Sequence, residues 1–405
     1  MPAAAEQTLP RPELQRLQLE RLRETVARSG LGEEIDSLDD LRRVPFATKA
    51  DLRENYPFGL LAVPREELVR LHASSGTHGK PTVVGYTADD LETWTELMAR
   101  CMTMAGVRPG MLIHNANGYG LFTGGFGFHQ GGERIGATVV PVSGGFTARQ
   151  AMLLSDLGAD VLVATPSYAL AIAQALEGAP TRLKLGLFGG EPWSEALRGE
   201  IESALGLQAV NFYGLSEMCG PGVAAECLEE RDGLHVQEDH FLVEVVDPDD
   251  GTPVAPGEEG ELVFTTLTKQ AMPLLRYRTR DFGRLVAEPC RCGRTTARIT
   301  GLRGRVDDML IVRGVNVHPS NVEQVVLSVE GVGPHYQLVL ERHGPMDELT
   351  LECEPAGEQD RDDLAKRLAH ALREQTGLRI GVTVRDPGAI PRSEGKAVRV
   401  VDRRG

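Results

Sequence analysis

Two periods of hydrophobic residues divide the N-terminal part of the chain into elements. Leucines at helical spacing predict an amphipathic helix over residues 11–30, ended by its final glycine. Residues 88–107 show the same spacing and predict a second helix, with Asp89 or Asp90 in the capping region. Between these helices, the alternating β-branched run "TVVGYT" at residues 82–87 predicts a strand.

From residue 111 onward, apolar strand segments alternate with helical segments. Strands are predicted at residues 111–120, 136–144, 160–166, 183–191 and 208–217, and helices at 148–157, 167–176 and after Trp193. This repetition is typical of a parallel sheet covered on both faces. Ligands bind such sheets at the carboxyl ends of the strands. The unusual residues fall at these ends: Asn115 to Gly120, Thr165 to Ser167, Gly189 to Glu191, and Tyr213 to Glu217.

The second half of the chain changes pattern twice. Residues 223–300 carry short strands separated by hairpin turns, which predicts a β-rich subdomain. A β-β-α-β pattern follows over residues 335–386, small enough to form a separate mobile lid. We therefore expect an α/β fold. Residues 1–306 would form a large multi-layered N-terminal domain with mostly parallel sheets, and residues 307–405 a small α+β C-terminal lid domain.

Composition narrows the classes of function. The 405 residues carry a formal net charge of −15, which argues against a general nucleic-acid binder because phosphate contacts need basic surface. Neither a long apolar run nor a signal peptide is visible, so we expect a cytoplasmic protein that does not cross a membrane. Six cysteines in such a chain fit reduced thiols or a metal site better than disulfides.

The run "ASSGTHGKP" at residues 73–81 looks like a phosphate-binding loop. Gly76 and Gly79 are only three residues apart and Pro81 follows Lys80, which excludes a Walker A loop. Because a strand rather than a helix comes next, this loop is expected to join two strands. Its hydroxyls, backbone N–H groups and lysine could bind phosphate; a flexible hairpin loop is the alternative.

A metal site is predicted in the β-rich region. Cys290 and Cys292 form a C-x-C pair, and Cys227 with His235 forms a second pair. Three thiolates and one imidazole make the closed tetrahedral shell of a structural Zn²⁺ site. The C-x-C spacing is tighter than the usual zinc spacing, so free thiols are the alternative, and His240 is a reserve ligand. The other cysteines look like small core residues: Cys101, Cys219 and Cys353.

The aromatic and glycine-rich run "NGYGLFTGGFGFH" follows a predicted strand. Tyr119, Phe122, Phe126 and Gly127 suit a flat apolar acid, with glycines leaving room for a ring. Core packing is the alternative for each aromatic residue.

Five short motifs occur in a fixed order: "ASSGTHGKP", "FYGLSE", "YRTRD", "GRVDD" and "EGK". In this order they resemble the adenylate-forming superfamily. Longer runs, such as "RYRTRDFGRL" and "DDMLIVRGVNVHPSNVE", resemble phenylacetate-coenzyme A ligases and their aryl-acid-activating relatives over nearly the whole chain. The resemblance implies that a small aromatic carboxylic acid reacts with ATP and Mg²⁺ to give an acyl-adenylate, which coenzyme A converts to a thioester. A carrier protein or an amine is the alternative acceptor, and a homodimer is favoured.

The resemblance also gives roles to the motif residues. Phosphate contacts are expected from the loop: Ser74, Ser75, Gly76, Thr77, Gly79 and Lys80. Contacts with the adenine and phosphates are expected from two strand ends: Gly189, Gly190, Glu191, Tyr213, Gly214 and Ser216. Glu217 is the expected Mg²⁺ ligand, because a hard carboxylate suits a hard cation. Asp281 fits the ribose hydroxyls, and Arg280 stands where the wider superfamily has glycine. Arg305 is expected to contact the nucleotide, with a surface ion pair as the alternative.

Lys396 in "EGK" is expected to be catalytic. Carboxylate attack on the α-phosphate brings two anions together, and an ammonium between them lowers that barrier. Asp307 corresponds to the hinge about which the lid would turn, bringing Arg313 and Gly314 to the pantetheine arm of coenzyme A. A catalytically silent nucleotide-binding regulator is the competing class, and the retained acidic and basic residues argue against it.

Overall fold

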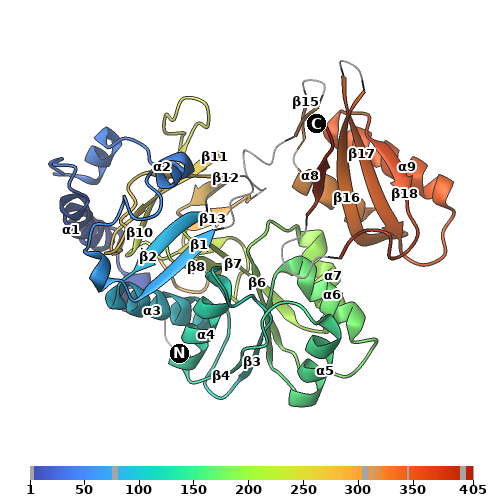
Figure 1. Ribbon diagram of the computed structural model, residues 1–405, viewed down its shortest axis with the longest axis horizontal. Coiled ribbons are helices and arrows are strands. Elements are labelled where there is room, and N and C mark those ends of the chain that lie inside the picture. Colours follow the sequence, from blue (N-terminus) through green and yellow to red (C-terminus); the bar gives the residue numbers. More distant parts are fainter. Residues whose placement is uncertain are drawn as a thin grey trace.

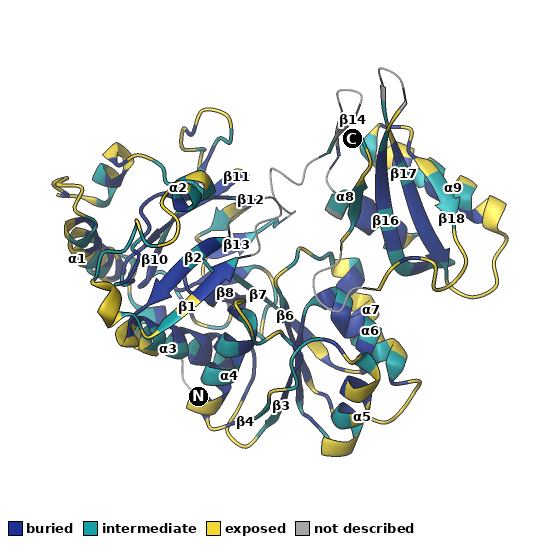
Figure 2. Ribbon diagram, viewed as in Figure 1, coloured by how far each residue is buried: buried dark blue, intermediate teal, exposed yellow. Residues whose placement is uncertain are grey.

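The computed structural model describes residues 4–74, 81–302, 310–312, 315–317, 319–343, 346–392 and 398–404. Figure 1 shows a large part that carries α1 (Arg11–Ser29) and a smaller C-terminal part that carries α9 (Arg361–Thr376). Figure 2 shows buried strands inside each part and exposed residues on the outer turns of the helices. Each part therefore has its own apolar core.

One mixed sheet of eleven strands forms the centre of the large part, in the order β10-β11-β12-β13-β9-β8-β7-β6-β5-β3-β4. Its parallel half contains β3 (Leu112–Asn115), β4 (Thr138–Val140), β5 (Val161–Ala164), β6 (Leu185–Gly189) and β7 (Gln208–Leu215). Its antiparallel half contains β8 (Gly220–Glu226), β9 (Leu234–Val236), β10 (Phe241–Val246), β11 (Gly260–Thr266), β12 (Tyr277–Val286) and β13 (Arg298–Thr300). The strands of the predicted β-rich subdomain therefore extend the parallel sheet rather than forming a separate one.

Five helices cover the two faces of the parallel half. They are α3 (Ala88–Met104), α4 (Gly124–Ile135), α5 (Thr147–Leu157), α6 (Pro166–Ala175) and α7 (Glu195–Leu205). Successive residues of a strand point to opposite faces, so Val161 and Val163 of β5 pack in the cluster with α3 and α4. Leu162 and Ala164 pack in the cluster with α5, α6 and α7. This two-sided burial explains why β5 reads as a continuous apolar run.

Helix α4 lies within the glycine-rich run, where no helix was expected. Its glycines allow close packing against α3: a Cβ on Gly131 would lie 2.7 Å from Cβ of Met98. A Cβ on Gly127 would lie 2.9 Å from the Trp94 ring. Glycine is unfavourable inside a helix by about 1 kcal/mol relative to alanine. Tertiary contact between the two helices therefore outweighs local propensity here.

The N-terminal segments pack beside this sheet. Helix α1 ends at Gly30, which has φ 72°, as predicted. The shorter elements are η1 (Ala5–Thr8), η2 (Leu38–Arg43), α2 (Lys49–Glu54) and η3 (Arg65–Glu67). Strands β1 (Arg70–Ser74) and β2 (Thr82–Tyr86) form an antiparallel ribbon, so the phosphate-loop run does join two strands. Thr87, rather than Asp89 or Asp90, is the N-cap of α3, and Asp90 completes its capping box.

The C-terminal part is a four-stranded sheet with two helices on it. Its sheet has the order β18-β17-β16-β19. Its elements are β14 (Leu310–Val312), β15 (Val315–Val317), α8 (Pro319–Ser328), β16 (Val332–His343), β17 (Met346–Pro355), α9, β18 (Gly381–Val384) and β19 (Val400–Asp402). The predicted β-β-α-β order is present as β16-β17-α9-β18. The predicted boundary and hinge at Asp307 lie outside the described residues, so both stay predictions.

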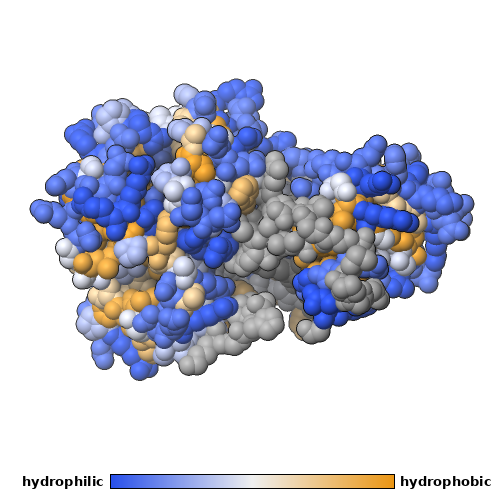
Figure 3. Space-filling view, turned by 90° about the horizontal axis from the view of Figure 1, so that it is seen from above, coloured by the Kyte–Doolittle hydropathy of each residue, from blue (hydrophilic) through white to orange (hydrophobic). Residues whose placement is uncertain are grey.

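Hydrophilic residues predominate over the face of the molecule shown in Figure 3, with small apolar patches between them. None of the helices in the described part of the chain is long and apolar enough to cross a membrane.

Candidate active site

The predicted Mg²⁺ ligand lies beside the start of the phosphate-loop run. Glu217, just beyond β7, is only 4% exposed. The Ser74 hydroxyl, at the end of β1, donates a hydrogen bond of 3.2 Å to Oε1 of Glu217. Nζ of Lys49 lies 3.9 Å from the same oxygen. The end of β1 therefore lies beside Glu217, which brings the start of the predicted phosphate-binding run next to the predicted Mg²⁺ ligand.

Two side chains that no motif contains hold the backbone at Glu217. The Tyr86 hydroxyl donates to the Ser216 carbonyl at 3.0 Å. The Lys269 ammonium donates to the Glu217 carbonyl at 3.1 Å and to the Met218 carbonyl. Sequence reasoning missed both residues because their partners are 130 and 52 residues away.

Tyr213 and Asp281, which are both predicted to contact the nucleotide, are hydrogen-bonded to each other. The Tyr213 hydroxyl donates to Oδ2 of Asp281 at 2.6 Å. Burial, and then the negative charge of Asp281, raise the pKa of Tyr213 well above its usual value, so the phenol stays protonated at neutral pH. One face of the Tyr213 ring stacks on Phe264, with centroids 5.8 Å apart. Stacking of adenine on this ring remains a prediction.

Arg280 precedes Asp281, at the position where the wider superfamily has glycine. Arg280 has φ 66°, in the left-handed region that favours glycine. Its backbone N–H donates to Oε1 of Glu261 at 3.1 Å, which helps to hold this conformation. The glycine expected from the wider superfamily is thus replaced by an arginine held in a conformation typical of glycine.

The "GGE" run ends β6 beside the end of β7. Gly189 pairs with Phe212, and a Cβ on Gly189 would lie only 2.2 Å from the Phe212 carbonyl oxygen. Gly190 has φ 85° and is exposed. The Glu191 carboxylate accepts a hydrogen bond of 2.7 Å from the backbone N–H of Ser167, in the first turn of α6. The structure therefore gives a packing reason for Gly189 and a hydrogen-bonding reason for Glu191, and the adenine contact stays a prediction.

The aromatic run forms a cluster around Tyr119. Asn115 donates to the Tyr119 oxygen at 2.7 Å, and that oxygen lies 3.1 Å from Nδ1 of His129. Burial raises the pKa of Tyr119 to about 12. The Phe126 ring lies edge-on to Tyr119, with centroids 5.4 Å apart. Phe122 is 52% exposed, and the space beside Gly127 is filled by Trp94 and Pro221 rather than left open.

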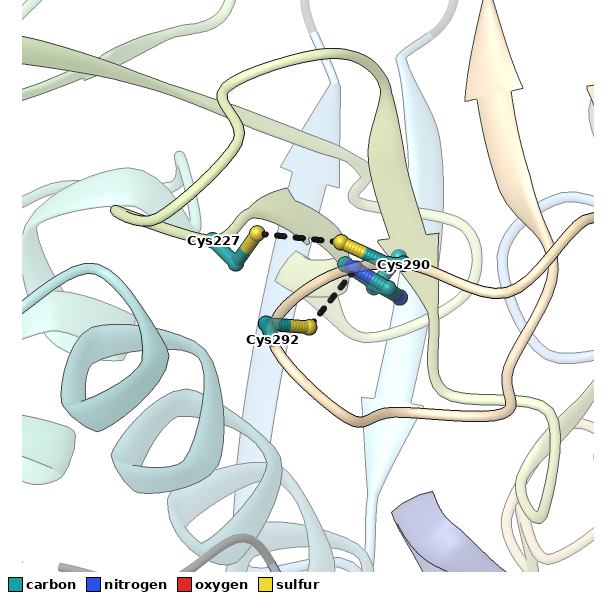
Figure 4. A group of neighbouring side chains, drawn as sticks. Cys227, Cys290 and Cys292 are labelled. Atoms are coloured by element: carbon teal, nitrogen blue, oxygen red, sulfur yellow. Dashed lines mark hydrogen bonds between the residues drawn. The ribbon is translucent and has the colours of Figure 1, made fainter.

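The four predicted metal ligands come together in the structure. Their ligand atoms all lie within 4.8 Å of one another: Cys227, His235, Cys290 and Cys292. Figure 4 shows Sγ of Cys227 opposite Sγ of Cys290, 3.6 Å apart. Sγ of Cys292 lies 3.4 Å from Nε2 of His235. Nδ1 of His235 pairs with the Thr296 hydroxyl at 3.1 Å, the kind of outer contact that orients a ligating imidazole.

Other cysteine and histidine candidates are used elsewhere. Nδ1 of His240 pairs with the Thr268 hydroxyl at 2.7 Å, and its Nε2 lies 3.1 Å from Asp239, so the reserve ligand is not needed. The three cysteines predicted to be core residues are buried: Cys101, Cys219 and Cys353.

Comparison with known proteins decides the family. A family model described as "AMP-binding enzyme" matches residues 14–268, more than half of the chain, and one described as "AMP-binding enzyme C-terminal domain" matches residues 314–404. The chain belongs to the AMP-binding enzymes. It is 50% identical to a phenylacetate-coenzyme A ligase of Thermus thermophilus over 98% of both chains.

Two crystal structures of one ligase, in different states, are similar to this chain to different degrees. The chain superposes on 2-hydroxyisobutyryl-CoA ligase in the postadenylation state with a TM-score of 0.92, at 29% identity, covering 99% of this chain and 94% of that one. For the thioesterification state of the same ligase the TM-score is 0.72, at 30% identity, covering 98% and 91%. Coverage is nearly the same in the two comparisons, so this structure as a whole superposes more closely on the postadenylation state of that ligase than on its thioesterification state.

Helix α8 and strand β16 contact the large part in this arrangement. The Ser194 backbone N–H donates to Oε2 of Glu323 at 3.2 Å. The Gln174 amide nitrogen lies 2.7 Å from Nε2 of His335. Burial lowers the pKa of His335 to about 4, so at neutral pH its imidazole can accept this hydrogen bond. Leu327 packs on the cluster formed with α5, α6 and α7.

The remaining predicted site residues of this AMP-binding enzyme lie outside the described residues. They are Ser75, Gly76, Thr77, Gly79, Lys80, Arg305, Asp307, Arg313, Gly314 and Lys396. Their roles stay predictions, whereas Ser74, Glu217, Tyr213 and Asp281 are shown to lie in pairs at the sheet end.

Proposed function

We propose that the chain is an ATP-dependent aryl-acid:coenzyme A ligase, with phenylacetate as the first acid to test. The observation that carries the proposal is the pairing of Ser74 with Glu217 and of Tyr213 with Asp281, both near the end of β7. The chain's 50% identity to a phenylacetate-coenzyme A ligase supports the acid and the thiol acceptor.

ATP would lie across these two pairs. The Asp281 carboxylate would accept hydrogen bonds from both ribose hydroxyls, while Tyr213, Gly189 and Gly190 border the adenine. Glu217 would be the Mg²⁺ ligand, and the cation would neutralise charge on the phosphates when bound. Hydroxyls and N–H groups of residues 74–80 would contact the phosphate oxygens.

The acid would lie beside the aromatic cluster. Tyr119 and Phe126 form one wall, and Arg70 lies over the Phe126 ring at 4.9 Å from its centroid. Phe122 is accessible enough to close on a ligand. Gly127 allows α4 to approach α3 and so fixes this wall, in place of leaving room for the ring of the acid.

The C-terminal part would supply a different group to each half-reaction. Lys396 would lie between the acid and the α-phosphate during adenylation. Turning about Asp307 would then bring Arg313 and Gly314 to coenzyme A. Lys396→Ala should therefore slow adenylate formation by about a hundredfold or more, as expected for a lost transition-state charge, and should spare thioester formation from supplied acyl-adenylate. Equal losses in the two steps would contradict this role.

Pyrophosphate release with ATP and Mg²⁺, across aryl and aliphatic acids with and without coenzyme A, tests the function. Turnover on one aryl acid that rises with coenzyme A, together with a detected thioester, supports the ligase. A single-turnover burst that coenzyme A does not change would point to a carrier protein or an amine as acceptor. No release with any acid would contradict adenylation altogether.

Structural Zn²⁺ belongs to the same proposal. Cys227, His235, Cys290 and Cys292 would hold it in a closed tetrahedral shell that ties the end of β8 to the β12–β13 connection. Metal analysis should find about one zinc per chain, and Cys290→Ser should lose it and unfold at lower temperature. Cys353→Ser, in the other part, should keep the metal. A purified, unmutated chain that contains no zinc would contradict the proposed Zn²⁺ site.

We further propose a homodimer in the cytoplasm, where ATP and coenzyme A are present. Sedimentation equilibrium tests the dimer, and a monomer mass would contradict it.

A further inference from the structure

Lys269 is an ammonium group inside the protein. It lies in the connection between β11 and β12 and is only 6% exposed. Taking a lysine charge out of water is costly, so buried lysines are rare and usually have specific partners. Here the partners are the carbonyls of Glu217 and Met218 and the face of the Tyr86 ring, 4.5 Å from Nζ to the centroid.

These contacts all serve one short segment. Tyr86 also donates its hydroxyl to the Ser216 carbonyl, so the carbonyls of residues 216, 217 and 218 are each bound by a side chain from elsewhere in the chain. The segment follows the last residue of β7, and a loop in that position would otherwise be free to adopt other backbone conformations. Lys269 and Tyr86 together hold the main chain of this segment through its carbonyl groups.

The Glu217 side chain contacts other residues than its main chain does. Its Oε1 accepts from Ser74 at 3.2 Å and lies 3.9 Å from Nζ of Lys49. Lys269 donates to the main-chain carbonyls of Glu217 and Met218, whereas Oε1 of the Glu217 carboxylate contacts Ser74. Burial lowers the pKa of Lys269 to about 8, so the group is still mainly charged at neutral pH.

We propose that Lys269 is a positioning residue of the adenylation half-reaction: its buried ammonium fixes the Glu217 segment so that the carboxylate is placed for Mg²⁺–ATP. The inference rests on the proposed function, because it takes Glu217 as the Mg²⁺ ligand. A neutral side chain of similar length would fill the space and leave two carbonyls without a donor.

Lys269→Met tests the inference. The Mg²⁺ concentration that gives half-maximal pyrophosphate release should rise about tenfold or more, because the two hydrogen bonds from the charged ammonium are lost, and kcat should fall. The KM for the acid should stay within about twofold, because the aromatic cluster is untouched. Lys184→Met is the matched control: it removes an exposed lysine paired with Asp160 at 2.7 Å, and should leave the Mg²⁺ dependence unchanged.

Two further measurements keep the result interpretable. If Lys269→Met does not fold, Tyr86→Phe removes only the hydroxyl at the Ser216 carbonyl and should shift the Mg²⁺ dependence in the same direction by a smaller factor. Calorimetric binding of ATP at several Mg²⁺ concentrations needs no acid, so it reads the Mg²⁺ effect even if the proposed turnover fails. A folded Lys269→Met chain with lower thermal stability and unchanged Mg²⁺ dependence overturns the inference. An unchanged chain that binds no ATP with Mg²⁺ overturns both the inference and the proposed function.

Discussion

Removing the Tyr213 hydroxyl should weaken ATP binding selectively. In Tyr213→Phe the ring still stacks on Phe264, but Asp281 loses the hydrogen bond of 2.6 Å that orients its carboxylate. A hydrogen bond to a charged group contributes about 1.5–3 kcal/mol. Asp281 is only partly buried, so water can replace part of the loss and the lower figure applies. About 1.5 kcal/mol corresponds to roughly a tenfold rise in the KM for ATP.

The assay is initial-rate pyrophosphate release with ATP varied at saturating acid and Mg²⁺. The kcat should fall less than kcat/KM, because the carboxylate binds ribose in both the ground state and the transition state. Tyr168→Phe is the control, since the Tyr168 hydroxyl is buried and donates to the Gly145 carbonyl at 2.9 Å, away from Asp281. A KM for ATP that does not change in Tyr213→Phe, with the melting temperature lowered, would refute the reasoning that Asp281 contacts the nucleotide.

Four other substitutions test packing and arrangement. Gly131→Ala should lower the free energy of unfolding by about 1–3 kcal/mol, because its new Cβ would overlap Met98. Gly199→Ala is the control: it lies in open space on α7 and should raise the free energy of unfolding by up to about 1 kcal/mol. Urea denaturation measures both changes, and equal effects would contradict the packing argument. Arg198→Met should destabilise by about 3 kcal/mol in the same assay, because it leaves the Glu226 carboxylate buried without its partner; a change below about 1 kcal/mol would contradict this. Leu327→Ser should slow adenylate formation more than thioester formation from supplied acyl-adenylate, since Leu327 packs on the large part in this structure, which superposes more closely on the postadenylation state. Equal effects on the two half-reactions, assayed separately, would contradict a role for that contact.

The sequence predicts the local elements well where period and turn residues agree. The strands β3, β5, β6 and β7 and the ribbon β1–β2 lie where expected, and the ends of β6 and β7 carry the candidate site. The cysteine and histidine positions also predicted a cluster that the fold then closed. For the strands, the signal lies within a few residues of the feature that it predicts. For the cluster, the signal is the type of residue, and the fold brings Cys227 and Cys290 together over 63 residues of sequence.

Features that depend on distant partners could not be predicted in this way. Helix α4 forms on glycines because α3 approaches it closely, and glycine count alone argues against a helix. The pairing of β13 with β9 continues one sheet through residues 298 and 235, which no local pattern reveals. Lys269 sits in no motif, and its function follows only from carbonyls that the fold brings to it.

The Ser194–Glu323 hydrogen bond joins the C-terminal part to the segment that follows Gly190. Any shift of that segment on nucleotide binding would change how firmly α8 is held. Thermodynamic reciprocity then requires that docking of α8 change the affinity for nucleotide by the same factor. In that case the nucleotide affinity of this chain depends on the contact between two parts that fold around separate cores. Kd values measured on the large part alone would then differ from those of the whole chain by that factor.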